Sequence, residues 1–391
     1  MASGLKILAL EPYFGGVHAA MLEGLRRRSR HRWVLLTMPA GKWPWRMRGA
    51  ALHLAAEAKT LAHRGFDLVF ASNFLNVADW KALAPEPLGR LPVITYFHEN
   101  QLSPPAEPGQ ERDAAYGFIN LTTCLASQEA WFNSAFHRDG FLEAARRLLK
   151  KMPDFVPEGL VESVAAKSRA MPPGMDLGPF RAGRRRAKRT PPLVILWNHR
   201  WEYDKDPETF FETLFFLAQE GVPFRLSVVG EAYRKWPPIF AEAKRRLADR
   251  FIQFGYLPDR KAYEDQVRRS DIVVSTARNE FFGLPVVEAV AAGCFPLVPD
   301  GLSYREIVPR AWHRTFLYRS ERELRTKLAR LLKGEGPWDL AARLADHVER
   351  YDWSSAIGAY DEALERAAGG LKSTGGQAAS GTRQGGSRRE D

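Results

Sequence analysis

Residues 280–288 read Glu-Phe-Phe-Gly-Leu-Pro-Val-Val-Glu, with a carboxylate on each side of a turn from a predicted strand into a predicted helix. Gly283 frees this turn, so that backbone N–H groups at the start of the helix, at Leu284, can face an anion. Glu288 projects further along the helix, where it can accept hydrogen bonds from ribose hydroxyls, and Glu280 can reach a sugar. Solvated or structural charges are the alternative. The stretch predicts a sugar-nucleotide site in an α/β domain.

Apolar runs of strand length alternate with helical patterns on both sides of this stretch. In the C-terminal half, strands are expected at residues 193–197, 225–229, 252–254, 271–275 and 295–298, with helices near 207–220, 261–269 and 284–292. In the N-terminal half, strands are expected at 5–10, 33–38, 66–70 and 93–97, with a helix over 50–61. Such alternation is typical of parallel sheets covered on both faces. We therefore predict an α/β protein with two Rossmann-like domains facing a central cleft.

Composition shifts along the chain suggest where these domains end. A stretch rich in Pro, Gly and Arg interrupts the pattern near the middle of the chain, and the C-terminal end is rich in Gly, Ser and Arg with little apolar content, which predicts disorder. If a sugar passes from a nucleotide donor to an acceptor, the expected parts are an acceptor domain over 1–172, a basic linker over 173–190, a donor domain over 191–350, a helix over 351–368 and a disordered tail over 369–391.

Two cations follow the first predicted strand of the C-terminal half. Arg200 and Lys205 lie where an α/β sheet places its ligand crevice, and a diphosphate leaving group needs positive charge nearby. By themselves they would read as surface charges. Gly230 and Tyr256 follow the next two strands and would form further walls of the crevice, near the base. Because Arg200 and Lys205 supply the positive charge that the diphosphate needs, we expect no metal requirement and no cofactor besides the donor.

The N-terminal half offers two loops at predicted strand ends. Gly15 and Gly16 would let the backbone approach a donor phosphate or sugar, although an ordinary tight turn explains them as well. His98, Glu99 and Asn100 form a polar cluster where the acceptor is expected, and His98 is a candidate catalytic residue. A structural histidine paired with Glu99 is the alternative.

Basic and aromatic residues are interleaved in a third segment, which reads as a Trp-Pro-Trp loop around residues 43–45. Trp43, Trp45, Arg46 and Arg48 are suited to stacking on unpaired bases and holding phosphates, with core packing of the tryptophans as the alternative. Residues 26–48 carry eight Lys and Arg and no Asp or Glu, and the net charge of the chain is +11. An anionic partner is expected.

The donor-side residues resemble the retaining GT-B glycosyltransferases of family 4. In that family the first Glu contacts the transferred sugar and the second the ribose, which implies these roles for Glu280 and Glu288, with Arg200 and Lys205 on the diphosphate. The donor-binding segment then includes Phe281, Phe282, Gly283 and Leu284. Phe281 departs from the family, which usually has Gly after the first Glu, and this can reshape the sugar pocket.

Three N-terminal motifs narrow the resemblance. Residues 11–18, 42–51 and 96–102 look like those of the tRNA-queuosine α-mannosyltransferase family. That family transfers mannose from GDP-mannose to the cyclopentenediol of queuosine at the wobble position of aspartate tRNA. The resemblance implies a mannosyltransferase with GDP-mannose and queuosine-containing tRNA-Asp as substrates.

Other features bear on location and on competing functions. There is no visible export signal or apolar run long enough to span a membrane, and both cysteines read as buried thiols, so we expect a cytoplasmic protein without stable membrane association. A family 4 transferase with a lipid or cell-envelope acceptor is the main alternative. An RNA-binding protein on an inactive transferase fold and a sugar-nucleotide epimerase remain as further alternatives.

Overall fold

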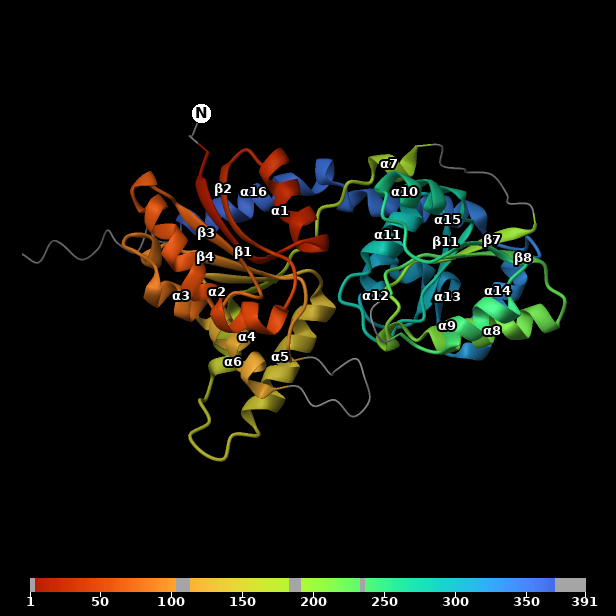
Figure 1. Cartoon of the computed structure of the whole chain (residues 1–391), viewed down its shortest axis with the longest axis horizontal. Coiled ribbons are helices and arrows are strands. Elements are labelled where there is room, and N and C mark those ends of the chain that lie inside the picture. Colours follow the sequence, from red (N-terminus) through yellow and green to blue (C-terminus); the bar gives the residue numbers. More distant parts are fainter. Residues whose placement is uncertain (1–3, 103–112, 183–190, 233–235, 370–391) are drawn as a thin grey trace, which may run out of the picture.

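The computed structural model describes residues 4–102, 113–182, 191–232 and 236–369. They form two lobes, each built on a six-stranded parallel sheet with helices on its faces (Figure 1). This confirms the predicted α/β fold with two Rossmann-like domains. The linker residues 183–190 and the tail residues 370–391, for which a basic segment and disorder are expected, lie outside the described residues.

The N-terminal sheet has the strand order β2-β1-β3-β4-β5-β6. Its strands are β1 (Lys6–Phe14), β2 (Arg32–Pro39), β3 (Leu68–Ser72), β4 (Val93–Phe97), β5 (Glu129–Phe132) and β6 (Ser168–Ala170). Its helices are α1 (Gly16–Arg28), α2 (Trp43–Ala58), α3 (Val77–Leu83), α4 (Ala114–Ala126), α5 (Ala135–Leu149) and α6 (Leu160–Ala166), with short 3₁₀ helices η1 (Lys59–Arg64) and η2 (Leu88–Arg90). Every residue of β3 and β4 is buried, as expected for strands covered on both faces.

The C-terminal sheet has the order β12-β11-β10-β7-β8-β9. Its strands are β7 (Leu193–Trp197), β8 (Phe224–Val228), β9 (Phe251–Phe254), β10 (Ile272–Val274), β11 (Phe295–Pro299) and β12 (Leu317–Tyr318). Its helices are α7 (Gly178–Arg181), α8 (Pro207–Gln219), α9 (Ile239–Arg246), α10 (Arg260–Arg269), α11 (Leu284–Ala291), α12 (Tyr304–Ile307), α13 (His313–Phe316), α14 (Glu321–Leu332) and α15 (Trp338–His347), with η3 (Tyr203–Lys205), η4 (Arg310–Trp312) and η5 (Val348–Tyr351). Met175, Leu177 and Phe180, expected in a linker, are buried in this lobe's core.

The last helix, α16 (Trp353–Gly369), crosses back and packs on the N-terminal lobe (Figure 1). Trp353, Tyr360 and Leu364 are buried in the same core as Ile7 of β1. A side chain at Gly24 of α1 would place its Cβ 2.3 Å from the Trp353 ring, so helix α1 accepts only glycine there. Burial of each large apolar side chain contributes about 1.5–3 kcal/mol to the packing of α16 on the N-terminal lobe.

The Trp-Pro-Trp segment is a helix start and not the loop that its composition suggests. Helix α2 begins at Trp43 and has its proline in the first turn, where a missing N–H costs nothing. The helix predicted to begin at residue 50 therefore starts seven residues earlier, and Trp43 and Trp45 project from its first turn.

Candidate functional site

The donor side of the site is organised around a buried ion pair. Glu280 follows β10, and one of its carboxylate oxygens lies 3.3 Å from Lys205 Nζ while the other accepts hydrogen bonds from the Phe282 and Gly283 N–H groups at 3.4 and 3.1 Å. Lys205 Nζ also donates to the carbonyl of Asn279 at 2.8 Å and lies 3.2 Å from Asp204. Glu280 and Lys205, each predicted to face the donor, are therefore in direct contact.

The electrostatics keep this pair charged. Burial opposes charge on Glu280, but Lys205, His199 and the hydrogen bond from the Phe282 N–H together lower the pKa of the carboxyl group. Burial likewise opposes charge on Lys205, and the carboxylates of Glu280 and Asp204 raise its pKa. The side chains of Lys205 and Glu280 are only 8% and 17% exposed, so water screens the pair weakly.

Glu288 lies on α11, and α10 holds it in place. Arg260 Nη2 donates to one carboxylate oxygen at 2.8 Å, and the Tyr263 hydroxyl donates to the other at 2.6 Å. Asn198, directly after β7, donates to the Tyr263 oxygen at 3.1 Å and to the Pro285 carbonyl at 3.0 Å. Burial, followed by the Glu288 charge, raises the pKa of Tyr263 well above its usual value, so the hydroxyl keeps its proton. Sequence reasoning gave no role of their own to Arg260 and Tyr263, in the first turn of α10, or to Asn198, directly after β7.

The loop after β7 separates an exposed cation from a buried anchor. The Arg200 side chain is 54% exposed and lies 3.1 Å from Glu202. Trp201, the next residue, is buried and stacks on Phe240 with ring centroids 4.1 Å apart. Gly230 packs against this loop so closely that a Cβ would lie 1.8 Å from the His199 carbonyl oxygen. Close packing therefore accounts for Gly230 without a ligand contact.

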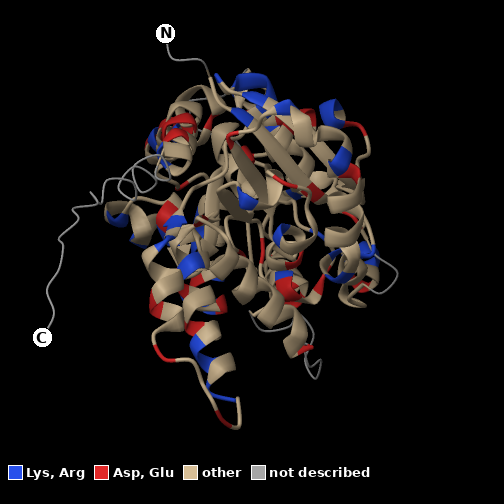
Figure 2. Cartoon of the chain, turned by 90° about the vertical axis from the view of Figure 1, so that its left-hand side faces the viewer, with Lys and Arg blue, Asp and Glu red and all other residues tan. Residues whose placement is uncertain are grey.

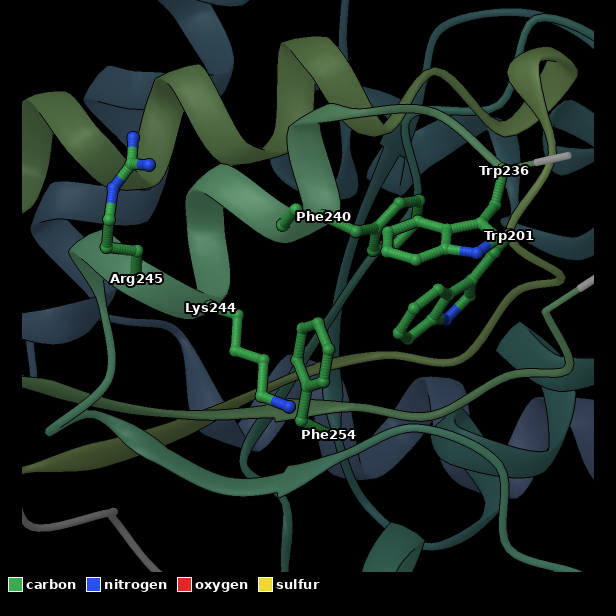
Figure 3. A pocket seen from close by; sticks show the side chains of 7 residues that line it. Trp201, Trp236, Phe240, Lys244, Arg245 and Phe254 are labelled. Atoms are coloured by element: carbon green, nitrogen blue, oxygen red, sulfur yellow. The ribbon is translucent and has the colours of Figure 1, made fainter.

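A pocket of about 480 Å³ lies behind this loop (Figure 3). Figure 3 shows the indoles of Trp201 and Trp236 together on one side and Lys244 extending toward Phe254. The lining consists of aromatic rings and two cations: Trp201, Trp236, Phe240, Ala241, Lys244, Arg245 and Phe254. None of these is a predicted donor or acceptor residue. Tyr256, predicted near the base, is 59% exposed and lies two residues beyond Phe254.

On the N-terminal lobe, a charged histidine lies between two carboxylates. The buried His18 places Nδ1 3.1 Å from Glu11 and Nε2 3.5 Å from Glu99. Glu11 also accepts from the Ser72 hydroxyl at 2.8 Å. Burial lowers the pKa of His18, but Glu11 and Glu99 together raise it to about 10. Sequence reasoning gave Glu11 and His18 no role of their own, although both belong to the quoted motif over residues 11–18.

The His98 ring packs against this imidazolium, with ring centroids 4.0 Å apart and the planes tilted by 32°. Burial, followed by the His18 charge, lowers the pKa of His98 well below its usual value, so His98 is neutral. Burial opposes charge on Glu99, but His18 and Arg200 together lower its pKa. The charge of Arg200, from the loop after β7, thus acts on Glu99 of the N-terminal lobe.

The same cluster could hold a cation by distance alone. Ligand atoms of Glu11, His18 and His98 all lie within 4.8 Å of one another. Both ring nitrogens of His18 already face carboxylates, however, and its raised pKa shows that a proton is favoured at this position. A metal bound here would have to displace that proton.

The remaining N-terminal candidates differ in how open they are. Asn100 is buried and accepts a hydrogen bond from the Leu102 N–H at 2.8 Å, which is a structural role within its loop. A Cβ added at Gly15 would lie 2.5 Å from the Cβ of Ala40, so packing favours glycine there. Gly16 has a φ of +52°, a left-handed conformation that favours glycine, and open space around it. Gly16 begins α1, whose first N–H groups have no side-chain cap.

The aromatic and basic residues of α2 are only partly available to a ligand. Trp45 is 70% exposed, whereas Trp43 is 37% exposed and contacts Tyr116 at 5.2 Å between ring centroids. Arg46 donates to the carbonyl of Pro39 at 3.0 Å, and Arg48 pairs with Asp113 at 2.8 Å. Core packing is therefore ruled out for Trp45, and Trp45 is the member of this group best placed to stack on a base.

Comparisons with known proteins match both lobes. Residues 6–175 match the family described as tRNA-queuosine alpha-mannosyltransferase N-terminal, and residues 182–350 match glycosyl transferases group 1. The tRNA-queuosine alpha-mannosyltransferase of Drosophila melanogaster is 35% identical over 315 residues, which cover 78% of this chain and 82% of the relative. The chain belongs to the tRNA-queuosine alpha-mannosyltransferase family. It is a glycosyltransferase, as the resemblance of its motifs predicts.

More distant similarities agree with the fold. The GDP-mannose:cellobiosyl-diphosphopolyprenol alpha-mannosyltransferase of Xanthomonas campestris is 24% identical, covering 82% of this chain and 80% of the relative. Anabaena Alr3699/HepE in complex with UDP-glucose has a TM-score of 0.66 at 15% identity, covering 92% of this chain and 99% of that one. Sucrose-phosphate synthase from Thermosynechococcus elongatus has a TM-score of 0.69 at 14% identity, covering 94% and 100%. These structures support the GT-B fold alone.

In the folded chain, several arginines of the basic run over residues 26–48 pair with acidic residues outside that run. Arg26 and Arg27 pair with Glu23, Arg28 with Asp176 and Arg30 with Glu365. Figure 2 shows Asp and Glu interspersed with Lys and Arg on this side of the molecule. The single-sign patch suggested by the sequence is therefore partly neutralised in the fold.

Among the described residues, no helix is long and apolar enough to span a membrane.

Proposed function

We propose that this enzyme transfers mannose from GDP-mannose, with retention of configuration, to queuosine at the wobble position of tRNA-Asp. The observation that carries the proposal is the pairing of sites across the two lobes. The ionised Glu280 beside Lys205 lies on the donor side, and the carbonyl of the next residue, Phe281, accepts a hydrogen bond from Ser134 of the N-terminal lobe at 2.5 Å. The family membership supports the choice of acceptor.

Each donor residue has a physical task in this proposal. Glu288, held by Arg260 and Tyr263, keeps lone pairs for the ribose hydroxyls, and Glu280 accepts from hydroxyls of the transferred sugar. As the bond from the sugar C1 to the diphosphate breaks, Arg200 and Lys205 stabilise the negative charge left on the phosphate oxygens. The acceptor oxygen bonds to C1, and its proton passes to the departing phosphate.

Relatives support guanosine diphosphate mannose as the donor. The names of both the X. campestris relative and a Mycobacterium tuberculosis relative, which is 28% identical over 151 residues, specify GDP-mannose.

Since two cations, Arg200 and Lys205, are available for the leaving group, we propose that no metal is required. Activity that persists in a chelator, without added magnesium or manganese, is the expected result.

On the acceptor side, the exposed Trp45 and the neutral His98 fit an unpaired, splayed nucleotide. Glu99 can accept a hydrogen bond from a hydroxyl of the cyclopentenediol. Because tRNA would be the substrate and both cysteines are buried free thiols, we propose that the enzyme acts in the cytoplasm.

A lipid-linked acceptor is the second candidate. The names of the two bacterial relatives describe acceptors built on diphosphopolyprenol and phosphatidylinositol. Incubating the protein with GDP-mannose and either queuosine-containing tRNA or polyprenyl-linked saccharides distinguishes the two. Nucleoside mass spectrometry should find hexosylated queuosine. Transfer to the lipid acceptor alone would replace our proposal with the second candidate.

A further inference from the structure

The residue that follows Glu280 is bound twice to the opposite lobe. The Phe281 ring stacks on the ring of His137, with centroids 4.1 Å apart and 25° between planes. The Phe281 carbonyl accepts a hydrogen bond from the Ser134 hydroxyl at 2.5 Å. Ser134 also caps α5 by accepting from the His137 N–H at 3.0 Å, so the hydroxyl both donates and accepts. The loop that carries Glu280 is thus fixed against the start of α5.

A second link crosses between the lobes beside the first. Glu306 of α12 accepts hydrogen bonds from the Ala135 and Phe136 N–H groups at 2.9 and 2.7 Å. A carboxylate at the first turn of a helix accepts hydrogen bonds from N–H groups that lack a partner within the helix, and its negative charge interacts favourably with the helix dipole. The C-terminal lobe therefore supplies a cap for a helix of the N-terminal lobe. Ser303, just before α12, donates to the Glu280 carbonyl at 3.2 Å and so joins this cap to the donor loop.

From α5 the chain of contacts continues to the acceptor side. Asn133 donates through Nδ2 to the His98 carbonyl at 2.8 Å, which leaves its Oδ1 to accept from His137 Nδ1 at 2.9 Å. Burial lowers the pKa of His137 to about 3, so the ring is neutral with its proton on Nδ1. His137 therefore contacts Phe281 on its face and Asn133 at its edge. A continuous path of packing and hydrogen bonds connects the Glu280 loop with the His98 loop.

We propose that Phe281, His137 and Glu306 are positioning residues that place Glu280, and the sugar it holds, against the acceptor held near His98. They act through the contact between lobes and touch neither substrate. This explains why a phenylalanine stands where family 4 transferases usually have glycine, since glycine has no ring to stack on His137. The inference rests on the proposed transfer for its kinetic test, but not for the contact itself.

The test compares Phe281→Ala and Glu306→Ala with Glu306→Gln, which keeps one accepting oxygen, and with Glu335→Ala as a control. Glu335 is exposed, and its carboxylate lies 3.8 Å from Arg330 within the C-terminal lobe. Misplacing reacting groups by about 1 Å can cost on the order of 10²-fold in rate. We expect both alanine variants to lose roughly 10-fold or more in kcat, with donor Kd measured without acceptor changing less than about 2-fold. Glu306→Gln should recover part of the rate.

Combining the two alanine changes separates positioning from independent effects. Because both break one contact, the double variant should lose less rate than the product of the single losses. Donor Kd rising in step with the loss of kcat would mean that the loop serves donor binding alone and would overturn the inference. Unchanged kcat in both single variants would overturn it as well.

A measurement without acceptor separates this inference from the proposed function. If wild-type protein fails to modify queuosine-containing tRNA, the proposed function is wrong, and small-angle X-ray scattering then tests the contact on the full chain. With GDP-mannose present, Glu306→Ala should have a larger radius of gyration than wild type and Glu335→Ala. Equal radii in that experiment would overturn the positioning role.

Discussion

Replacing Lys205 with alanine removes the cation on which the donor side depends. The substitution leaves Glu280 and Asp204 close together, with the side chain of Glu280 only 17% exposed and no cation at 3.3 Å. Removing one partner of a buried ion pair costs about 3–5 kcal/mol of folding free energy, and the partial exposure of Glu280 places the expected loss near 3 kcal/mol. Loss of one preorganised charge at the leaving group costs about 10²-fold in kcat, or about 2.7 kcal/mol of transition-state stabilisation.

The acid limb of the pH profile gives an independent readout of the same change. In the wild-type protein, burial opposes charge on Glu280, and Lys205, with smaller contributions from His199 and the Phe282 N–H, lowers the pKa of the carboxyl group. Glu280 therefore contributes stability above the unfolded pKa of a glutamate, and this contribution is lost as pH falls through the lowered folded pKa. Without Lys205, burial raises the pKa of Glu280, so the acid limb of kcat/KM should move to higher pH.

Three measurements test this expectation against a matched variant. Denaturant unfolding, steady-state kinetics with GDP-mannose, and a pH–rate profile are compared for wild type, Lys205→Ala and Lys59→Ala, which removes an exposed lysine. Near-wild-type kcat and an unmoved acid limb in Lys205→Ala would refute the assignment of Lys205 to the leaving group and to Glu280.

Further predictions concern the other site residues. Glu280→Ala should chiefly lower kcat and Glu288→Ala should chiefly raise donor KM, and steady-state kinetics showing the reverse would exchange their roles. Trp45→Ala should weaken tRNA binding by roughly 10-fold or more, the scale of one stacked base, without changing donor affinity, and indifferent titrations would remove Trp45 from the acceptor site. The pKa of His18 is raised to about 10 from 6.5, so its contribution to stability is full below pH 6.5 and is lost as pH rises toward 10. Unfolding measured across that range should show this loss in wild type and not in His18→Gln.

The sequence predicts nine of the twelve strands of the two described sheets, because strands buried on both faces read as continuous apolar runs, as in β3 and β4. It misses β5, β6 and β12, which have only four, three and two residues. It also predicts that Glu280 and Lys205 lie at one donor site, since both follow strands at one edge of a parallel sheet, but it does not predict their direct ion pair. Local composition misplaces the start of α2, because the proline that suggests a loop stands in the first helical turn. It also separates α16 from the lobe on which it packs, since no local pattern identifies the surface that receives Trp353.

Long-range pairing explains the other differences. Arg28 and Arg30 are balanced by Asp176 and Glu365, which lie far away in the sequence and leave no trace in a local charge count. His18 and Glu99 meet only because β1 and β4 both flank β3. The effect of Phe281 likewise depends on how the lobes meet, since the ring it contacts belongs to the other domain.

Transfer of mannose to queuosine in tRNA by the Glu280 site can be measured directly. The most direct measurement incubates wild type and Glu280→Ala with GDP-mannose and tRNA-Asp, either containing queuosine or carrying unmodified guanosine at the wobble position, and analyses the nucleosides by mass spectrometry. We predict hexosylated queuosine with wild type alone and only on the queuosine-containing tRNA. Equal product from Glu280→Ala would show that Glu280 is not needed for the transfer, and no hexosylated queuosine from active wild-type protein would show that queuosine is not the acceptor.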